Sequence, residues 1–290
     1  MIALRIRHTT TYRYREPVRL GPHRLMLRPR ESRDLLLMSS FLSLTPEASV
    51  TWAHDVSGNT VATATFGAPA DRLVIDSVSE LQLEATPWPV FDIAAAAAVY
   101  PFFYSVEQSI DLGALTFPQY RDPEGRLGAW ARAFVRGPPT DTLALLKDLS
   151  VGVAEAARYE QREDEGTQSP IETLERGCGS CRDFAVLFAE AARSLGFGAR
   201  IVSGYLYSPL RDGDIGTTHA WAEIFLPGAG WITFDSTNRA VGGCNLVPVA
   251  VARDIGQATP VAGSFTGMTD AFAGMSVEVV VGLLNGGPPP

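Results

Sequence analysis

Residues 177–196 read Gly-Cys-Gly-Ser-Cys-Arg-Asp-Phe-Ala-Val-Leu-Phe-Ala-Glu-Ala-Ala-Arg-Ser-Leu-Gly, and this stretch contains the start, the buried face and the end of one helix. Ser180 suits the N-cap, and Asp183 follows three residues later, where its carboxylate can return to the cap backbone. Gly196 is of the type that ends helices. The stretch predicts a buried helix that begins at about Cys181. Its apolar face recurs at helical spacing: Phe184, Leu187, Phe188, Ala191, Ala192 and Leu195.

Cys181 is a candidate nucleophile because of where this helix begins. At a helix N-terminus, unpaired backbone N–H groups and the helix dipole stabilise a thiolate. A lone cysteine is nevertheless more often a small core residue, so the interpretation requires a base. The chain has four histidines, and three of them, His8, His23 and His54, lie in the N-terminal region. His219 is therefore the candidate base.

Two strand-like runs follow the helix and carry a histidine and a carboxylate. Residues 219–226 read His-Ala-Trp-Ala-Glu-Ile-Phe-Leu, an alternation that predicts a strand with His219 on its polar face. After a turn at 227–230, residues 231–237 predict a second strand that brings Asp235 back past His219. A loop made of all four turn residues would place the two side chains on opposite faces of the sheet. An active site here therefore requires a loop of odd length or a bulge, which the glycines at the turn permit.

The N-terminal region has the period-two pattern of β-strands. From Ile2 to about Leu83, apolar and polar residues alternate between turn signals such as Ser57-Gly58-Asn59. This pattern predicts a β-sandwich or a small barrel. The arginines between positions 5 and 33 alternate with apolar residues, which is typical of the solvated face of strands.

A change of composition separates this region from the rest of the chain. Residues 85–101 contain two Pro residues around Trp88 and then five consecutive alanines, which mark a junction. Helical patterns follow at 123–135 and 140–159, and the polar stretch 160–169 predicts an exposed loop.

The expected fold class is α+β. An N-terminal antiparallel β-sandwich-like domain at 1–90 should precede a second domain at 91–285, whose motifs lie between 140 and 240. Residues 286–290 should form a disordered tail.

Composition limits the classes of function. Hydrophobic residues make up 46% and charged residues 19% of the 290, which is enough apolar material for a core. The net charge of −8 argues against nucleic acid as a partner. No segment reaches the roughly 18 to 20 apolar residues of a membrane helix, and no secretory leader is evident, so we expect no membrane contact and a cytoplasmic location. The three cysteines cannot all pair within one chain, so at least one thiol is free.

Three segments resemble the motifs of the transglutaminase-like superfamily in their order and approximate spacing. They are Gly-Ser-Cys-Arg-Asp-Phe-Ala at 179–185, Thr-His-Ala-Trp-Ala-Glu at 218–223 and Gly-Trp-Ile-Thr-Phe-Asp-Ser-Thr at 230–237. The N-terminal blocks at 8–14 and 22–29, with Gly58-Asn59, are similar to the β-domain that precedes this core in bacterial members. One departure is Ser236, where the family commonly has proline.

The resemblance implies a papain-like core, with a Cys-bearing helix packed on an antiparallel sheet that bears the His and the Asp. Cys181 would be the nucleophile, His219 the general base and acid, and Asp235 the residue that holds the imidazole. The implied reaction is hydrolysis of an amide or peptide bond through a thioester, in a peptide or protein substrate. Transglutaminase activity, in which an amine replaces water, is the alternative with the same three residues.

Further expectations concern the surroundings of the site. The backbone N–H of Cys181 should stabilise the oxyanion, and Trp221 and Tyr207 are candidates to line the substrate groove. We expect no cofactor and no metal, because acidic clusters with calcium-binding spacing are not evident. The sequence does not indicate an oligomeric state.

Three other interpretations remain open. Cys178-Gly-Ser-Cys181 is a C-x-x-C motif at a helix start, as in thiol-disulfide oxidoreductases, where the first cysteine is the nucleophile. Cys178, Cys181, His219 and Cys244 have the ligand chemistry of a zinc site, although the second pair lacks the usual spacing. A non-catalytic relative that only binds peptides is the third possibility.

Overall fold

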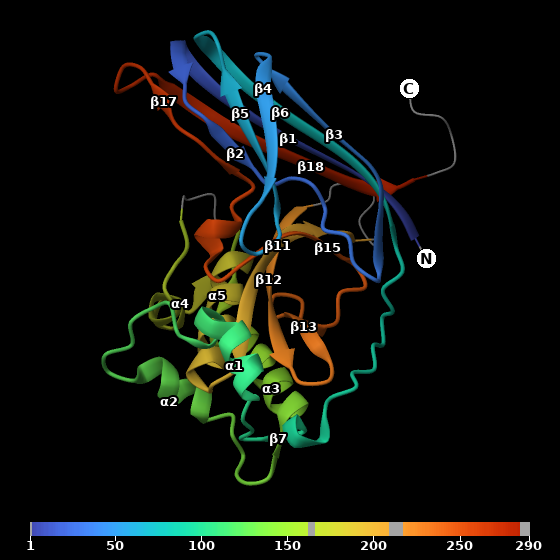
Figure 1. Cartoon of the computed structure of the whole chain (residues 1–290). Coiled ribbons are helices and arrows are strands. Elements are labelled where there is room, and N and C mark those ends of the chain that lie inside the picture. The colour runs from blue at the N-terminus through green and yellow to red at the C-terminus, as the bar shows by residue number, and fades with distance from the viewer. Residues whose placement is uncertain (1, 162–165, 209–216, 285–290) are drawn as a thin grey trace.

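The computed structural model describes residues 2–161, 166–208 and 217–284. It has two parts, a β-sandwich and a mixed α/β part with mostly antiparallel strands (Figure 1). The described strand pairings are antiparallel except for one short parallel pair, β9 (Arg158–Tyr159) with β10 (Cys178–Gly179). The mixed fold class predicted from the sequence is thus confirmed at this level.

The β-sandwich consists of two sheets with apolar inner faces. Their facing side chains, among them Leu25, Ala64, Leu73 and Ile75, are buried, as the period-two pattern predicted. The first sheet contains β1 (Ile2–Leu20), β3 (Leu35–Thr45), β6 (Ala70–Leu83), β17 (Phe265–Thr266) and β18 (Phe272–Leu283). The second contains β2 (His23–Leu25), β4 (Ala48–His54), β5 (Thr60–Phe66) and β16 (Val261–Ala262).

The last strands of the chain complete the N-terminal sheets. β18 pairs with β1 from Leu4↔Leu283 to Tyr14↔Phe272, and β16 pairs with β2. These strands fall within the range 91–285 expected for the second domain, yet their hydrogen bonds are to strands of the range 1–90. The pattern of a strand shows which face is buried but not which strand it pairs with. The predicted tail at 286–290 lies outside the described residues.

The second part is a sheet with helices on one face (Figure 1). The strand order is β14 (Ala240–Val241), β13 (Gly230–Asp235), β12 (Thr217–Leu226), β11 (Gly198–Leu206) and β15 (Leu246–Ala252). The helices are α1 (Val106–Leu112), α2 (Arg126–Arg132), α3 (Thr142–Ala156), α4 (Pro170–Arg176) and α5 (Cys181–Ser194). Shorter elements are η1 (Ala95–Ala97), η2 (Gly113–Thr116), η3 (Ile255–Ala258), β7 (Val99–Tyr100) and β8 (Thr140–Asp141). No helix in the described ranges combines the length and the apolar character needed to cross a bilayer.

Helix α5 lies in the centre of the main apolar core. Its Phe188 ring packs against Phe234 of β13, with ring centroids 5.2 Å apart, and Leu146 and Leu149 of α3 are buried in the same cluster. The spacing of apolar residues predicted this burial, because α5 and α3 each present one continuous apolar face.

A buried ion pair fixes the far end of α5. Arg193 Nη1 lies 2.5 Å from Glu190 Oε1, and both side chains are almost completely inaccessible to solvent. Glu190 also accepts from the backbone N–H groups of Gln119 and Tyr120. Arg193 donates to the backbone carbonyls of Leu115, Ala199 and Arg253. Because these partners belong to three other segments, the pair ties α5 to the sheet and to the loop before α2.

The two parts of the molecule share a second apolar core and a set of polar contacts. Leu4 and Ile6 of β1 pack in one cluster with Val247 and Val249 of β15. At the edge of this cluster, the buried His8 ring is 3.0 Å from the hydroxyl of Tyr205 on β11. The β-sandwich is therefore packed onto the sheet of the second part rather than joined to it by a linker alone.

Asn59 binds the backbone of β15 from the turn between β4 and β5. Its Nδ2 donates to the carbonyl of Val251 and its Oδ1 accepts from the N–H of Val251, both at 2.8 Å. The Asn59 side chain thus makes the two hydrogen bonds to Val251 that a neighbouring strand would make at this edge of the sheet. Asp55 holds the turn, because it accepts from the backbone N–H groups of Ser57 and Asn59.

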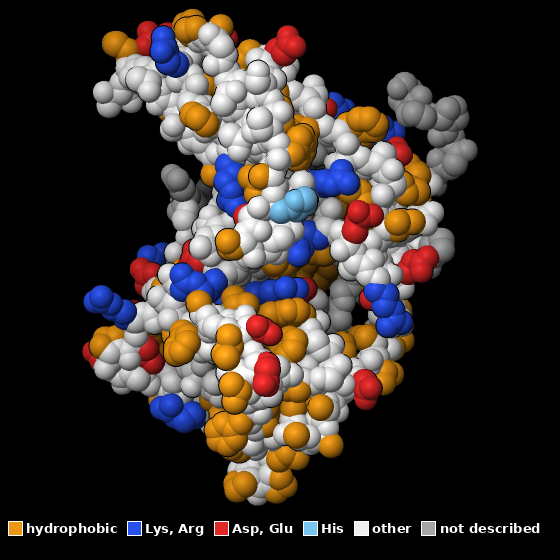
Figure 2. Space-filling view, viewed as in Figure 1, with side chains coloured by type: hydrophobic (Ala, Val, Ile, Leu, Met, Phe, Trp, Pro, Cys, Tyr) orange, Lys and Arg blue, Asp and Glu red, His pale blue; other side chains and the backbone are white. Residues whose placement is uncertain are grey.

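Basic side chains gather at the junction of the two parts on the face shown in Figure 2. Several arginines of the two parts have partners within the chain: Arg24 pairs with Asp55, Arg200 with Glu223, and Arg30 donates to Asn59. Arg7, on the outer face of β1, pairs with Asp76 in the same way. Arg7, Arg24 and Arg30 of the arginine-rich N-terminal stretch thus have polar partners within the chain.

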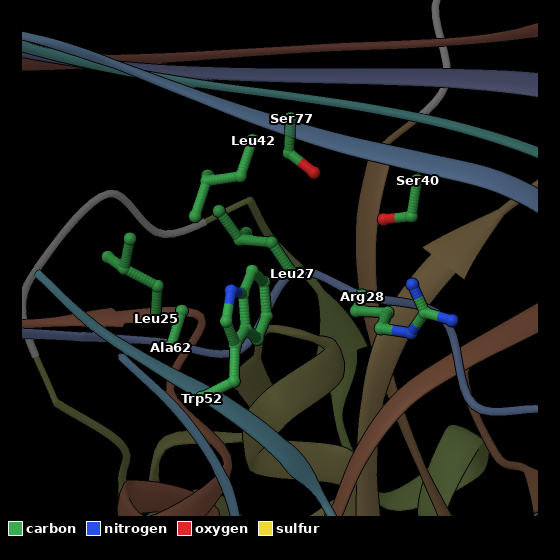
Figure 3. Close-up of a pocket in the computed structure, with 8 residues that line it drawn as sticks. All are labelled: Leu25, Leu27, Arg28, Ser40, Leu42, Trp52, Ala62 and Ser77. Carbon is green, nitrogen blue, oxygen red and sulfur yellow. The ribbon is translucent and has the colours of Figure 1, made fainter. Parts of the chain in front are cut away.

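The β-sandwich encloses a small hollow between β3 and β6 on one side and β4 and β5 on the other (Figure 3). Its volume of about 10 Å³ is close to the space of one water molecule, which is too small for a peptide. The lining is apolar toward Leu25, Leu27, Leu42, Trp52 and Ala62 and polar toward Arg28, Ser40 and Ser77. A larger hollow of about 220 Å³ lies beside α2 and α4, and it includes Tyr120, Leu127 and Ile171.

The Asn59 contact leads to a prediction about stability. Asn59→Ala leaves the N–H and the carbonyl of Val251 without these partners, and each such loss costs roughly 1–3 kcal/mol. We expect the free energy of unfolding to fall by about 2 kcal/mol or more in a urea titration. Val56→Ala is the matched control, because Val56 lies in the same turn and is fully exposed. The control should change stability by less than about 0.5 kcal/mol, and equal stability of both variants would contradict the role of Asn59.

Candidate active site

Helix α5 begins at Cys181, and a buried carboxylate holds this end of the helix. Asp183 is completely buried, and its Oδ2 accepts from the backbone N–H of Ser180 at 2.7 Å and from its hydroxyl at 2.9 Å. This is the return contact of a capping box. The backbone N–H of Cys181, in the first turn, has no acceptor within the helix.

Gln168 adds a second set of contacts to the same carboxylate. Its backbone N–H donates to Asp183 Oδ1 at 2.7 Å, and its side-chain amide reaches Asp183 Oδ2 and the carbonyl of Cys178. Gln168 is buried, although the polar stretch 160–169 predicted an exposed loop, so that prediction is wrong at this residue. Gly179 is required nearby, because a Cβ there would lie 2.9 Å from the Cβ of Asp183. The polar character of the stretch 160–169 could not indicate that Gln168 is buried, because its partner, Asp183, is 15 residues away in the sequence.

The β12–β13 hairpin brings His219 and Asp235 together. Leu226 pairs with Gly230, so the loop holds three residues and has the odd length that an active site requires. The register continues with Ala222 opposite Phe234, which places His219 and Asp235 on the same face of the sheet. His219 Nε2 lies 2.8 Å from Asp235 Oδ2, and both side chains are buried.

The electrostatics of the pair favour a charged imidazole. Burial alone would lower the pKa of His219, but the hydrogen bonds to Asp235 and to the Cys181 side chain outweigh it and raise the pKa to about 9. For Asp235, burial acts to raise the pKa, and the hydrogen bond and charge of His219 reverse this, so that its pKa is lowered. Because Nε2 faces Asp235, Nδ1 is the ring nitrogen left for Cys181. The site therefore joins a thiol, an imidazole and a carboxylate in that order.

The two residues predicted to line a groove lie in different places. Trp221 is 2% exposed, and its ring stacks beside that of His219 with centroids 6.0 Å apart. It packs against Val202 and Leu246, so it supports the histidine more than it could offer surface to a substrate. Tyr207 is half-buried against the apolar cluster shared by the two parts, and its backbone N–H donates to Asn245.

The other two cysteines are separate from this arrangement. Cys178 lies beside Glu160, whose hydrogen bond raises the pKa of the thiol. That shift disfavours the thiolate which the first cysteine of a redox C-x-x-C motif needs. Cys244 is half-buried in the loop before β15, and all three cysteines are unpaired. Within the described ranges, no three His, Cys, Asp or Glu side chains are grouped so that they could hold a metal ion, which gives no support to a zinc site at Cys178, Cys181, His219 and Cys244.

The structure adds a residue that the sequence motifs did not indicate. Asn238, three residues after Asp235, places its Nδ2 2.6 Å from Asp235 Oδ2. A polar residue three positions after a strand-terminal aspartate was the available signal, but the same pattern is common in ordinary turns. Ser236, which stands where the family commonly has proline, is buried and bonds to Ser150 of α3 at 2.9 Å. The departure from the family pattern thus links this turn to α3.

Comparison with known proteins identifies the class of the two parts. Residues 4–82 match the family model of the bacterial transglutaminase-like N-terminal region. Residues 128–236, which include Cys181, His219 and Asp235, match the model of the transglutaminase-like superfamily. These two matches confirm the resemblance seen in the motifs: a bacterial transglutaminase-like N-terminal region is followed by a region of the transglutaminase-like superfamily.

Individual relatives extend over almost the whole chain. The chain is 26% identical over 292 residues to the uncharacterised protein ML0607 of Mycobacterium leprae, covering 96% of this chain and 99% of that protein. It is similar in structure to a "putative cysteine protease" from Cytophaga hutchinsonii, with a TM-score of 0.74, 19% identity, and coverage of 100% of this chain and 93% of the other. At this identity the likeness shows a shared fold, and it includes both parts of the molecule.

The charge state of His219 can be measured directly. With a pKa of about 9, the imidazole should keep both ring protons up to nearly pH 9, whereas burial lowers the pKa of His8 to about 4 and should keep that ring neutral above pH 5. Ring ¹⁵N chemical shifts across pH 4–10 will separate the two, with His219→Gln and His8→Gln used for assignment. Titration of His219 below its ordinary value of about 6.5 would contradict this description of the site.

The pKa shifts of His219 and Asp235 also determine how the stability of the fold depends on pH. The pKa of His219 is raised on folding, so its stabilisation is complete below about pH 6.5 and is lost as the pH rises through about 9. The pKa of Asp235 is lowered, so its contribution is present above its ordinary value and is lost in acid.

Proposed function

We propose that the protein is a thiol-dependent hydrolase of amide or peptide bonds that works through a covalent thioester on Cys181. The observation that carries the proposal is the buried His219, which bonds to Asp235 through Nε2 at 2.8 Å and also forms a hydrogen bond with the Cys181 side chain. Nucleophile, base and orienting carboxylate thus come from one helix start and one hairpin. The superfamily match and the shared fold support this assignment.

The first half of the reaction forms the acyl-enzyme. The Cys181 thiolate attacks the amide carbonyl carbon, a C–S bond forms, and the carbonyl oxygen takes the negative charge. The N–H at the start of α5 is positioned to donate to this oxyanion. As the intermediate collapses, the C–N bond breaks and His219 gives its proton to the departing amine.

The second half returns the enzyme to its starting state. His219, now neutral, takes a proton from water, whose oxygen attacks the thioester carbon. The C–S bond then breaks, and the thiolate and the imidazolium form again beside Asp235. An amine in place of water would give a transamidation, so the acyl acceptor decides between hydrolase and transglutaminase. The proposed substrate is a peptide or protein amide.

The surroundings of His219 support this cycle. Asp235 holds Nε2 and favours the imidazolium, which in turn stabilises a nearby thiolate by charge. The helix N-terminus acts on Cys181 in the same direction. Cys178 has the opposite environment, since the carboxylate of Glu160 disfavours its thiolate.

Acylation by p-nitrophenyl acetate tests the proposal without a known substrate. We expect a burst of p-nitrophenol and the mass of one acetyl group on Cys181 after an acid quench. Cys181→Ala and His219→Ala should each lower the burst rate by roughly 10⁴-fold, and Asp235→Asn should leave a weak residual rate, because orientation of the base is lost. Cys178→Ala and Cys244→Ala are the matched controls and should retain the burst.

The outcomes distinguish the open interpretations. Loss of the burst in Cys178→Ala, with Cys181→Ala active, would contradict the proposal in favour of a redox protein. No acylation of any cysteine would favour a binding protein. If an added amine such as methylamine removes the acetyl group much faster than water does, the transfer reaction is the better description.

A further inference from the structure

Residues 235–239 form a turn in which Asn238 bonds to the Asp235 carboxylate through both its backbone and its side chain. The backbone N–H of Asn238 donates to Asp235 Oδ1 at 3.2 Å, and its side-chain Nδ2 donates to Asp235 Oδ2 at 2.6 Å. Oδ2 also accepts from His219 Nε2 at 2.8 Å. Asn238 thus donates to both oxygens of Asp235. The shorter of its two hydrogen bonds is to Oδ2, the oxygen that also accepts from His219.

The side chains of Asn238 and His219 lie close together, and both contact the Asp235 carboxylate. Asn238 Nδ2 and His219 Nε2 are 3.4 Å apart, and both are donors when Nε2 carries its proton. They do not bond to each other but converge on the same carboxylate oxygen. Asn238 therefore acts on His219 only through Asp235.

The backbone after Asn238 adopts a conformation that side chains rarely take. Arg239 has φ of 53° and is the non-glycine residue with positive φ among the described residues. Such a conformation costs of order 1–3 kcal/mol and persists only where the surroundings impose it. The chain reverses here, so that Ala240 of β14 pairs with Asp235, and this reversal brings the Asn238 side chain over the carboxylate. The strain at Arg239 is thus coupled to the position of Asn238.

Asn238 also lies between the ion pair and the solvent. It is exposed, whereas His219 and Asp235 beneath it are 6% and 2% exposed. Asn238 could therefore have two roles, to donate a hydrogen bond to Asp235 Oδ2 and to cover this oxygen against water. Exclusion of water and donation of a hydrogen bond are separable roles, which allows a test of each.

We propose that Asn238 is a positioning residue of the site, which holds the Asp235 carboxylate in the orientation in which Oδ2 accepts from His219. The inference rests on the function proposed above, because it assumes that His219 activates Cys181. Without the Asn238 amide, the carboxylate can rotate away from Nε2, so the imidazolium loses part of its stabilisation and the thiolate forms less readily.

The test measures the rate of iodoacetamide alkylation at Cys181 against pH, by mass spectrometry of each cysteine. Asn238→Ala removes both the amide and the cover, whereas Asn238→Leu keeps the bulk and removes only the hydrogen bond. We expect both variants to alkylate Cys181 about tenfold more slowly than the wild type near pH 6, in line with the loss of one charge-assisted hydrogen bond. The pH midpoint of the reaction should rise by about one unit, the equivalent of that tenfold change.

The matched control is Asn245→Ala, which removes an amide from the following loop, away from His219. It should have the wild-type profile. Thermal melts will show that the variants are folded, and the ring ¹⁵N shifts of His219 should show deprotonation at a lower pH in both Asn238 variants. A purely structural role of Asn238 would change the melting temperature without changing the pH midpoint.

Three results would be decisive. A lower rate and a shifted midpoint in both Asn238 variants support the proposal. A wild-type profile in Asn238→Leu overturns it, since cover without the hydrogen bond would then suffice. If the wild-type Cys181 reacts no faster than in His219→Ala, the proposed function itself fails, whatever the Asn238 variants do.

Discussion

The site depends on the burial of one helix, α5, against the sheet formed by β11, β12 and β13. Phe184, Phe188 and Ala191 are buried by this contact, and each large apolar side chain contributes roughly 1.5–3 kcal/mol. Because the packing leaves the helix no freedom to slide, its first residue has one position relative to the sheet. Cys181 therefore meets His219 as a consequence of core packing, and no separate contact is needed to bring them together.

The burial of α5 carries an electrostatic cost that the fold offsets at both ends. Asp183 and Glu190 are completely buried carboxylates, and such groups are tolerated only when they are paired or hydrogen-bonded. Ser180 and Gln168 surround the first, while Arg193 and two backbone N–H groups surround the second. The contacts of Glu190 and Arg193 attach the helix to segments that are 60 or more residues away in the sequence.

The β-sandwich is part of the support for this sheet. Its strand β1 pairs with β18 from the end of the chain, and its inner face continues into the apolar cluster around β15. Asn59 closes the contact by bonding both backbone groups of Val251. Since β15 pairs with β11, which pairs with β12, the contact is two strands away from His219. The likeness of fold to the Cytophaga hutchinsonii protein extends over both parts of the chain.

The sequence by itself determined the features that depend on residues close together in the chain. The capping residues and apolar period around Cys181 specified α5, and the alternation at 219–226 specified a strand with its histidine on one face. The sequence also showed that His219 and Asp235 can share a face of the sheet only if the hairpin loop has an odd number of residues or a bulge, and the loop has three residues. Only the tertiary structure decided which strands pair, that 261–283 return to the N-terminal sheets, that Gln168 is buried, and that Asn238 meets Asp235. The physical reason is that periodicity records which side of an element is apolar, whereas pairing partners and hydrogen-bond geometry arise only when distant segments pack together.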